Sequence, residues 1–248
     1  MKHHIEKYDV FCIIIIGVYM EMFSLNNQIE KVLRDENTSF LNPIDTRYVI
    51  NTLKKMNCSY KVFYLFDESE KLVVYNNNLD ITLFEIKCNS TLTHREILGS
   101  LFSHNISEEV FGDIIIDNDH YYIVVLDKIK NYLISNYNKV GNKKIELIEC
   151  DLEIVSNFTH KFKEINIQTS SLRIDAVISK LIPTSRNIIN EIISDKNVIV
   201  NYNLLKNKNY ILKENDIFSI RGVGKFKFIK IVSMTKSGKY QIMINKYI

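Results

Sequence analysis

The feature that most constrains the fold is an alternation of strand-like and helix-like segments in residues 79–155. Thr93 and Glu96 have the spacing of a capping box, which predicts a helix from this point to about His104. Short runs rich in β-branched and aromatic residues, typical of strands, lie on either side of it. The predicted strands are residues 81–87, 113–117, 121–126 and 144–150, and a second helix is predicted at residues 127–137. This βαββαβ order predicts a ferredoxin-like plait, and hence an α+β protein.

A smaller α/β unit is predicted before the plait, in residues 24–78. Asn42 followed by Pro43 is a favourable pair for the N-cap and first turn of a helix, so we expect a helix to begin there. Residues 60–66 and 72–75 have the pattern of two strands on either side of a polar turn. They predict a hairpin.

Residues 1–23 are expected to be an extension in front of these units. The apolar run at residues 10–20 is too short to cross a bilayer as a helix, and no small-residue cleavage site follows it. We therefore expect no membrane partner. Met1, Met20 and Met22 are the alternative starts of the protein.

Charge is distributed unevenly along the chain. Residues 172–248 hold 14 Lys and Arg against 5 Asp and Glu, whereas residues 1–171 hold 18 against 24. Such an asymmetry predicts a polyanion as the partner of the basic part. The alternative is a solvated, Lys-rich surface without a binding role. The domain boundary is expected in the polar stretch of residues 157–171.

The basic part begins with two predicted helices. Ser171 is positioned to cap the first and Ser185 to cap the second. Both helices have apolar residues at helical spacing, which are expected to face inward. These residues are Ile174, Val177, Ile178 and Leu181 in the first helix, and Ile188, Ile189, Ile192 and Ile193 in the second. Strands are predicted at residues 198–200, 217–220 and 226–231.

Two arginines, Arg173 and Arg186, fall in the first turns of these helices. Because helix N-termini favour anions, an arginine there would reinforce a phosphate-binding site. The alternative for each is a surface ion pair, with Asp175 and Glu191 as the obvious partners. Residues 221–225 contain two glycines and predict a tight basic hairpin; they lack the spacing and the Ser or Thr of a Walker A loop.

The basic part resembles an S4 RNA-binding domain. The resemblance lies in residues 172–175, 184–186, 198–201 and 216–226, in order and in spacing. It implies two short helices packed on a small sheet in residues 171–248, and a surface that binds the backbone of shaped RNA.

Segments further upstream resemble the bacterial YlmH family, which places an S4 domain after a plait-like RNA-binding domain. These segments are residues 40–43, 94–101 and 112–114. The resemblance implies a cytoplasmic, non-enzymatic factor without a cofactor. Its implied partners are ribosomal RNA and tRNA on the large ribosomal subunit carrying peptidyl-tRNA, in rescue or quality control of stalled translation. An older association of the family is with cell division.

The resemblance also implies which side chains contact RNA. Arg173 and Arg186 are the first candidates, followed by Arg221 and Lys225. Lys225 replaces the usual arginine, which keeps the charge but loses bidentate phosphate geometry. The complete set of candidate RNA-binding residues is Arg173, Arg186, Lys196, Asn201, Lys208, Arg221, Lys225 and Lys227.

The sequence contains no recognisable catalytic or metal-binding motif. The four cysteines are far apart and the six histidines include no HxxxH or HExxH spacing, so we expect neither a zinc site nor a disulfide framework. His94 with Glu96, or His120 with Asp117 and Asp119, could be imagined as acid–base pairs, but adjacency in sequence is not geometry. An RNA-modifying enzyme is therefore a disfavoured alternative. A scaffold in which the acidic N-terminal part binds a protein stays open.

The strand predicted at residues 121–126 lacks the glycines of the RNA-recognition-motif signature. Ordinary packing is therefore favoured over base stacking for Tyr121 and Tyr122.

Overall fold

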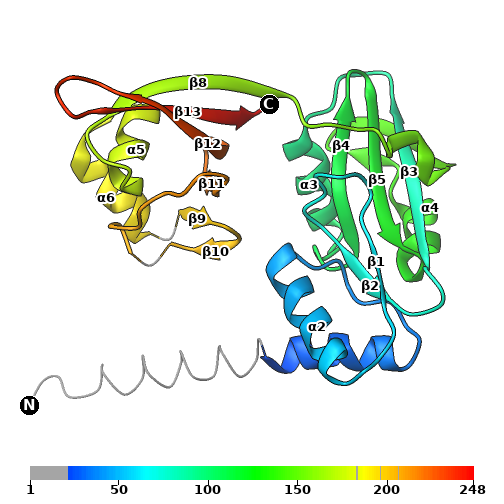
Figure 1. Cartoon of the computed structure of the whole chain (residues 1–248). Helices are drawn as coiled ribbons and strands as arrows, with labels where there is room; N and C mark the ends of the chain where they lie inside the picture. Colours follow the sequence, from blue (N-terminus) through cyan, green and yellow to red (C-terminus); the bar gives the residue numbers. More distant parts are fainter. Residues whose placement is uncertain (1–21, 183, 196, 206) are drawn as a thin grey trace, which may run out of the picture. The chain divides into compact units, whose positions relative to one another are not determined.

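A computed structural model describes residues 22–248 of the protein, except residues 183, 196 and 206. The chain divides into two compact units, Met1–Thr159 and His160–Ile248 (Figure 1). Both units contain helices and strands, which confirms the predicted α+β class. Residues 1–21, most of the predicted extension, lie outside the described residues.

The described part of the first unit starts with a helix over residues 22–33, followed by α2 (Pro43–Lys55). The side chain of Asn42 accepts hydrogen bonds from two backbone N–H groups of the first turn of α2, so the predicted N-cap is confirmed. Strands β1 (Lys61–Phe63) and β2 (Val73–Tyr75) pair antiparallel. The predicted hairpin is therefore present, with shorter strands than expected.

An antiparallel sheet with the strand order β4-β5-β3-β7-β6 follows. This is the strand order of a ferredoxin-like plait, as predicted. The short strand β6 is added at one edge of the sheet. Thr93 and Glu96 each accept a hydrogen bond from the backbone of the other, so the capping box is confirmed. The elements are β3 (Ile81–Cys88), α3 (His94–Ser103), β4 (Phe111–Asp117), β5 (His120–Leu126), a 3-10 turn (Asp127–Ile129), α4 (Lys130–Asn136), β6 (Lys139–Val140) and β7 (Lys143–Cys150).

Both faces of this sheet are covered. On one face, the helices pack against buried side chains of the sheet such as Phe84 and Ile123. On the other face, Phe40 and Phe66 from the N-terminal segment pack against residues that include Val124. The N-terminal segment and the plait therefore share a core within one compact unit.

Gly112 permits the close packing of the N-terminal segment on the sheet. A Cβ atom at this position would lie 2.5 Å from Cγ1 of Val124 and 2.8 Å from Cε1 of Phe40. Gly112 also lies within the irregular pairing of β4 with β5, between Phe111 and Ile114. The absence of a side chain here is what allows the ring of Phe40 to reach the strand.

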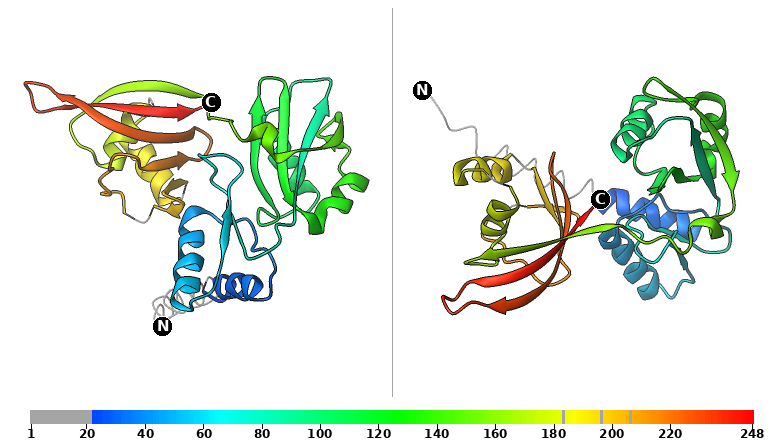
Figure 2. Two further views of the ribbon diagram at one scale, coloured as in Figure 1. Left: turned by 45° about the vertical axis from the view of Figure 1, so that its right-hand side comes forward. Right: turned by 90° about the horizontal axis from the view of Figure 1, so that it is seen from above.

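The second unit is a six-stranded antiparallel sheet with α5 and α6 on one face (Figures 1 and 2). Its strand order is β10-β9-β11-β12-β13-β8. The core between helices and sheet includes Val177, Ile189, Phe218 and Phe228. The elements are β8 (Phe162–Thr169), α5 (Ile174–Leu181), α6 (Arg186–Ser194), β9 (Val198–Val200), β10 (Asn203–Leu204), β11 (Ile217–Ile220), β12 (Gly224–Met234) and β13 (Tyr240–Tyr247).

Strand β8 occupies most of the stretch that the sequence predicts as a linker, residues 157–171. It pairs with β13 from Phe162 to Thr169. Ile165 and Ile167 pack against the core of the second unit, while polar residues alternate with them. The second unit therefore includes a strand upstream of residue 171.

The predicted cap at Ser171 is wrong. Helix α5 begins at Ile174, its N-cap is Arg173, and no side chain caps it. The residues before the helix stay extended because Arg173 forms an isolated β-bridge with Ile211. The hydroxyl of Ser171 instead accepts a hydrogen bond from the backbone N–H of Arg173.

Helix α6 agrees with the prediction except at one position. Ser185 is its N-cap and accepts a hydrogen bond from the backbone N–H of Ile188. The side chain of Ile188 is 46% exposed, so its predicted inward position is wrong. Ile189 and Ile193, one helical turn apart, make the buried contact with the core.

Candidate nucleic-acid interface

The charge asymmetry of the sequence coincides with the division into two units. The second unit, His160–Ile248, contains 16 Lys and Arg against 6 Asp and Glu, whereas the first contains 16 against 23. The asymmetry is strongest in β11, β12 and β13: residues 217–248 contain seven Lys and Arg and no Asp or Glu. The second unit thus presents the surface that is best suited to a polyanion.

Arg173 is held in a forked ion pair at the start of α5. Its Nη2 lies 2.7 Å from Oδ2 of Asp175, and its Nε lies 3.1 Å from Oδ1 of the same carboxylate. The hydrogen bond to Asp175 raises the pKa of the guanidinium above its ordinary value. The ion pair that the sequence left as the alternative is therefore present. The pair uses two of the five guanidinium N–H donors, so a phosphate could still be bound by the others.

Asn201 has an internal structural role. It adopts a left-handed conformation with φ 46° directly after β9. Its Nδ2 donates to Oδ1 of Asp216 at 2.8 Å, and its Oδ1 accepts from the backbone N–H of Ile217 at 3.0 Å. Both ends of the side-chain amide are thus engaged within the unit, and the side chain fixes the turn between β9 and β10.

Asp216 is the centre of this polar network. The carboxylate is buried and accepts hydrogen bonds from Asn201, from the hydroxyl of Tyr210 and from the backbone N–H of Lys213. The carbonyl of Tyr210 in turn accepts from the first N–H of α5, at Ile174. The network therefore ties the turn that carries the exposed Lys208 to the start of α5, which is where Arg173 lies.

The other candidates lie on β12 and on the turn before it. Arg221 is exposed, and its backbone N–H donates to the carbonyl of Asn197 at 2.9 Å. Lys225 and Lys227 alternate with the buried Phe226 and Phe228, so they lie on the sheet face opposite α5 and α6.

Lys225 contacts an aromatic ring on the neighbouring strand. Its Nζ lies 4.8 Å from the ring centroid of Tyr247, a cation–π distance. Burial lowers the pKa of this ammonium group to about 8.

The candidates thus fall on two sides of the second unit. Arg173 and Lys208 lie near the start of α5, whereas Lys225 and Lys227 lie on the face of the sheet opposite the helices. Arg186 is the first residue of α6 and Lys196 lies outside the described residues. Sequence reasoning did not single out Lys230, Lys236 and Lys239 on the β12–β13 hairpin, although the absence of acidic residues after Asp216 was a signal for them.

Tyr121 and Tyr122, the two tyrosines of β5, are packing residues. The ring of Tyr121 is buried and its hydroxyl accepts a hydrogen bond from the backbone N–H of Leu92 at 3.0 Å. Tyr122 packs on the face that the N-terminal segment covers. The packing interpretation is therefore confirmed for both, and neither ring is a free platform for a base.

Glu96 does not have the properties of a general acid or base. Hydrogen bonds from Lys143 and from the backbone and side chain of Thr93 lower the pKa of its carboxyl group to about 2. It is therefore fixed as a carboxylate in the capping box. His120 lies beside Glu85, with 2.8 Å between Nδ1 and Oε1.

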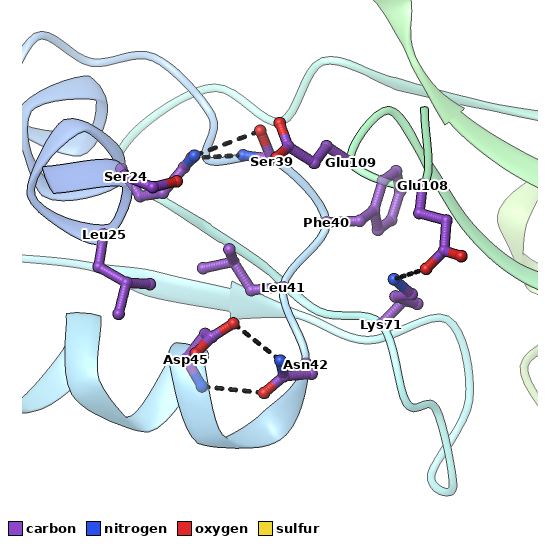
Figure 3. Close-up of a pocket in the computed structure, with 11 residues that line it drawn as sticks. Ser24, Leu25, Ser39, Phe40, Leu41, Asn42, Asp45, Lys71, Glu108 and Glu109 are labelled. Carbon is purple, nitrogen blue, oxygen red and sulfur yellow. Dashed lines mark hydrogen bonds and ion pairs between the residues drawn. The ribbon is translucent and has the colours of Figure 1, made fainter. Parts of the chain in front are cut away.

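A pocket of about 210 Å³ lies in the first unit, between the N-terminal helix, the residues before α2 and the segment before β4 (Figure 3). Its lining includes the carboxylates of Asp45, Glu108 and Glu109 but only one basic residue, Lys71, which forms an ion pair with Glu108. An acidic lining does not suit phosphate groups. The pocket is therefore a poor site for nucleic acid.

Within residues 22–248, apart from residues 183, 196 and 206, no helix is long and apolar enough to cross a membrane. Nor does that part hold a group of three or more His, Cys, Asp or Glu side chains placed to bind a metal ion.

The chain is similar to known proteins in sequence and in structure. Residues 75–154 match the family model described as "Putative RNA-binding domain in YlmH". The chain is 28% identical over 157 residues to "Ribosome-associated protein quality control protein P2" of Bacillus subtilis (strain 168), a match that covers 63% of this chain and 61% of that protein. The match thus spans about three fifths of the relative's length.

A solved structure, "Cell division protein ylmH from Streptococcus pneumoniae", is similar with a TM-score of 0.47 and 17% sequence identity. The similarity covers 63% of this chain and 99% of that one. The family model matches the whole plait, from β3 to β7, and the relative in Bacillus subtilis matches a longer part of the chain. Residues 75–154 are thus similar to the putative RNA-binding domain of the YlmH family, and a longer part of the chain is similar to the protein of Bacillus subtilis.

Proposed function

We propose that the protein is a non-enzymatic RNA-binding factor that acts at the ribosome in the quality control of stalled translation. The observation that carries this proposal is the concentration of positive charge in the second unit, above all the seven Lys and Arg and no Asp or Glu in residues 217–248. The description of the family model and the name of the relative in Bacillus subtilis support the same class of function.

The finer proposal is that the protein binds the large ribosomal subunit carrying peptidyl-tRNA, through ribosomal RNA and tRNA. Such a factor works in the cytoplasm, where ribosomes translate. Arg173 and Lys208, near the start of α5, would contact phosphates. Arg186 is proposed as a further contact because it is the first residue of α6. Arginine forks suit phosphate because two parallel N–H donors can bind one phosphate group.

The energetics of such binding are dominated by phosphate neutralisation. When the logarithm of the affinity is plotted against the logarithm of the salt concentration, each phosphate contact contributes roughly −0.7 to −0.9 to the slope. About six contacts would give a slope near −5. Binding should therefore be tight at low salt and weak at high salt.

The test is the binding of purified large ribosomal subunits, with and without P-site tRNA, across a series of salt concentrations. The variant Arg173→Ala/Arg186→Ala should bind about tenfold or more weakly, with a slope shallower by roughly 1.4 to 1.8, because two phosphate contacts are lost. A matched control is Arg34→Ala/Arg47→Ala, since both arginines are exposed in the first unit and Arg34 also forms an ion pair with an acidic neighbour, Glu30.

Three outcomes separate the parts of this proposal. Loss of affinity in the Arg173/Arg186 variant only, with tighter binding when tRNA is present, supports it in full. Binding that does not respond to tRNA would indicate that the protein binds the large subunit but does not contact tRNA. Equal binding by the wild type and both variants would show that these arginines are not in the interface.

We also propose that the first unit binds a protein. Its excess of acidic residues suits a basic surface on a protein, and the pocket in Figure 3 has an acidic lining. Capture of a partner by the full chain after RNase treatment, and its loss on charge reversal at Glu108 and Glu109, would support this role. Capture that RNase abolishes would contradict it.

A further inference from the structure

The β12–β13 hairpin extends beyond the part of the sheet that α5 and α6 cover (Figure 1). We call residues 229–241 the arm. Five consecutive residues of β12 in the arm, from Lys230 to Met234, are exposed. Successive residues of a strand point to opposite faces, so this part of β12 is uncovered on both faces.

Three apolar side chains lie in this uncovered stretch. Ile231 is 40% exposed, Val232 is 50% exposed and Met234 is 60% exposed. Such a cluster of exposed apolar side chains on a strand is unfavourable in water and is typical of a binding surface. The stretch is nevertheless a regular strand, because it pairs with β13 as far as Met234 opposite Tyr240.

The arm is also fixed at its base and tip. The pairing with β13 is irregular between Phe228 and Lys230 and again between Ile231 and Ser233, and irregularities of this kind increase the local twist and redirect side chains. The carboxylate of Glu214 accepts a hydrogen bond from the backbone N–H of Ile231 at 3.1 Å. At the tip, the backbone N–H of Thr235 donates to the carbonyl of Lys239 at 2.8 Å.

The charge of the arm points to a particular partner. Lys230, Lys236 and Lys239 lie in it, and it contains no Asp or Glu. The lysines are at its base and its tip, with the exposed apolar side chains between them. A partner with closely spaced negative charges and a partly apolar surface between them fits this arrangement, as the sugar–phosphate surface of an RNA helix does.

We infer that the arm is a second RNA-contacting element, which lies against the shallow groove of helical RNA with its three lysines on phosphates and Val232 and Met234 on the sugars between them. This inference rests on the proposed function, because it assigns a further contact to the same RNA. The arm is a surface distinct from the start of α5, and it contains none of the candidate residues predicted from the sequence.

Two variants separate the two kinds of contact. Lys230→Gln/Lys236→Gln/Lys239→Gln removes the charges, and Val232→Ser/Met234→Ser removes the apolar side chains. All five residues are exposed, so neither variant should change the fold. The control is Lys54→Gln/Lys55→Gln/Lys61→Gln, which removes three exposed lysines from the first unit, outside the part that matches the family model.

The probes are purified large ribosomal subunits and a blunt RNA duplex of about 20 base pairs, long enough for a protein to contact successive grooves. The lysine variant should bind both about tenfold or more weakly near 0.1 M salt, with a slope shallower by roughly 2 to 3. The apolar variant should bind about three- to tenfold more weakly with the slope of the wild type, because it neutralises no phosphate. The control should bind as the wild type does.

The outcomes distinguish this inference from the proposed function. If the wild type binds the subunits and both arm variants bind equally well, the inference is overturned while the proposed function stands, and a protein partner becomes the better occupant of the arm. If the wild type binds neither probe, the proposed function fails and the inference fails with it. Unequal unfolding midpoints of the variants would be detected by circular dichroism before binding is compared.

Discussion

Asp113, on β4, is a residue whose surroundings make stability depend on pH. Its Oδ2 accepts hydrogen bonds from the backbone N–H groups of Glu70, at 3.0 Å, and Lys71, at 3.3 Å. Burial nevertheless raises the pKa of its carboxyl group to about 6. The loss of hydration therefore outweighs these two hydrogen bonds, and the charged form is disfavoured in the folded unit.

The sign of the resulting pH dependence follows from this shift. Between about pH 4 and pH 6 the folded state holds a proton on Asp113 that the unfolded state has released, so the free energy of unfolding falls as the pH rises through this range. The penalty is complete above about pH 6 and amounts to roughly 2 to 3 kcal/mol.

We predict that Asp113→Asn removes this decline, because the amide oxygen can accept both backbone hydrogen bonds without a charge. The urea midpoints of the variant and the wild type, measured from pH 4 to pH 7, should diverge in favour of the variant as the pH rises. Parallel curves would show that Asp113 does not titrate in this range.

Side-chain contacts of single residues were the least predictable feature of the candidate site. The sequence showed Arg173 near the start of a helix with Asp175 close to it. The same sequence is compatible with a free arginine side chain and with an ion pair between the two residues. Asn201 was a candidate for RNA because of its place in the S4 resemblance. Its hydrogen bond to Asp216, fifteen residues away, forms only when the chain has folded.

At the scale of elements, the predictions succeeded where local signals were strong. The capping box at Thr93 and the N-cap at Asn42 are formed as predicted, since both depend on residues within one helical turn. Strands β8 and β13 were missed, and β12 was recognised only in part. Much of β8 is polar, and its few apolar residues gain a role only when β13 pairs with it.

The packing between elements can be tested at Gly112. We predict that Gly112→Ala destabilises the first unit by about 1 to 3 kcal/mol, because the added methyl group would overlap Val124 and Phe40. The matched control is Gly99→Ala in α3, where a Cβ atom would meet nothing within 4 Å. That change should stabilise by up to about 1 kcal/mol, since alanine is the better helix former. Urea unfolding measures both, and similar effects of the two changes would contradict the packing argument.

At the scale of the whole molecule, the chain combines an acidic unit with a basic one. Residues 1–159 carry 16 Lys and Arg against 23 Asp and Glu, and residues 160–248 carry 16 against 6. Like charges within the basic unit repel each other, and a bound polyanion relieves this repulsion. The charge division therefore favours phosphate contacts through the basic unit.

The boundary between the units determines which fragment retains the fold of the basic unit. A fragment of residues 171–248, as the sequence predicts, would lack β8. The edge of β13 would then be unpaired over the eight residues that pair with Phe162–Thr169, and Ile165 and Ile167 would be missing from the core. Exposed edges of this kind promote association between chains.

We therefore predict that a fragment of residues 160–248 is monomeric and unfolds cooperatively, because it contains every strand of the six-stranded sheet. The fragment of residues 171–248 should unfold at a lower urea concentration and elute as larger species on size-exclusion chromatography. The control is the fragment of residues 160–248 with Lys163→Thr, which keeps β8. It should behave as the unchanged fragment of residues 160–248 does. Equal stability of the long and short fragments would show that β8 is not required by the fold, and RNA binding could then be assigned to residues 171–248 alone.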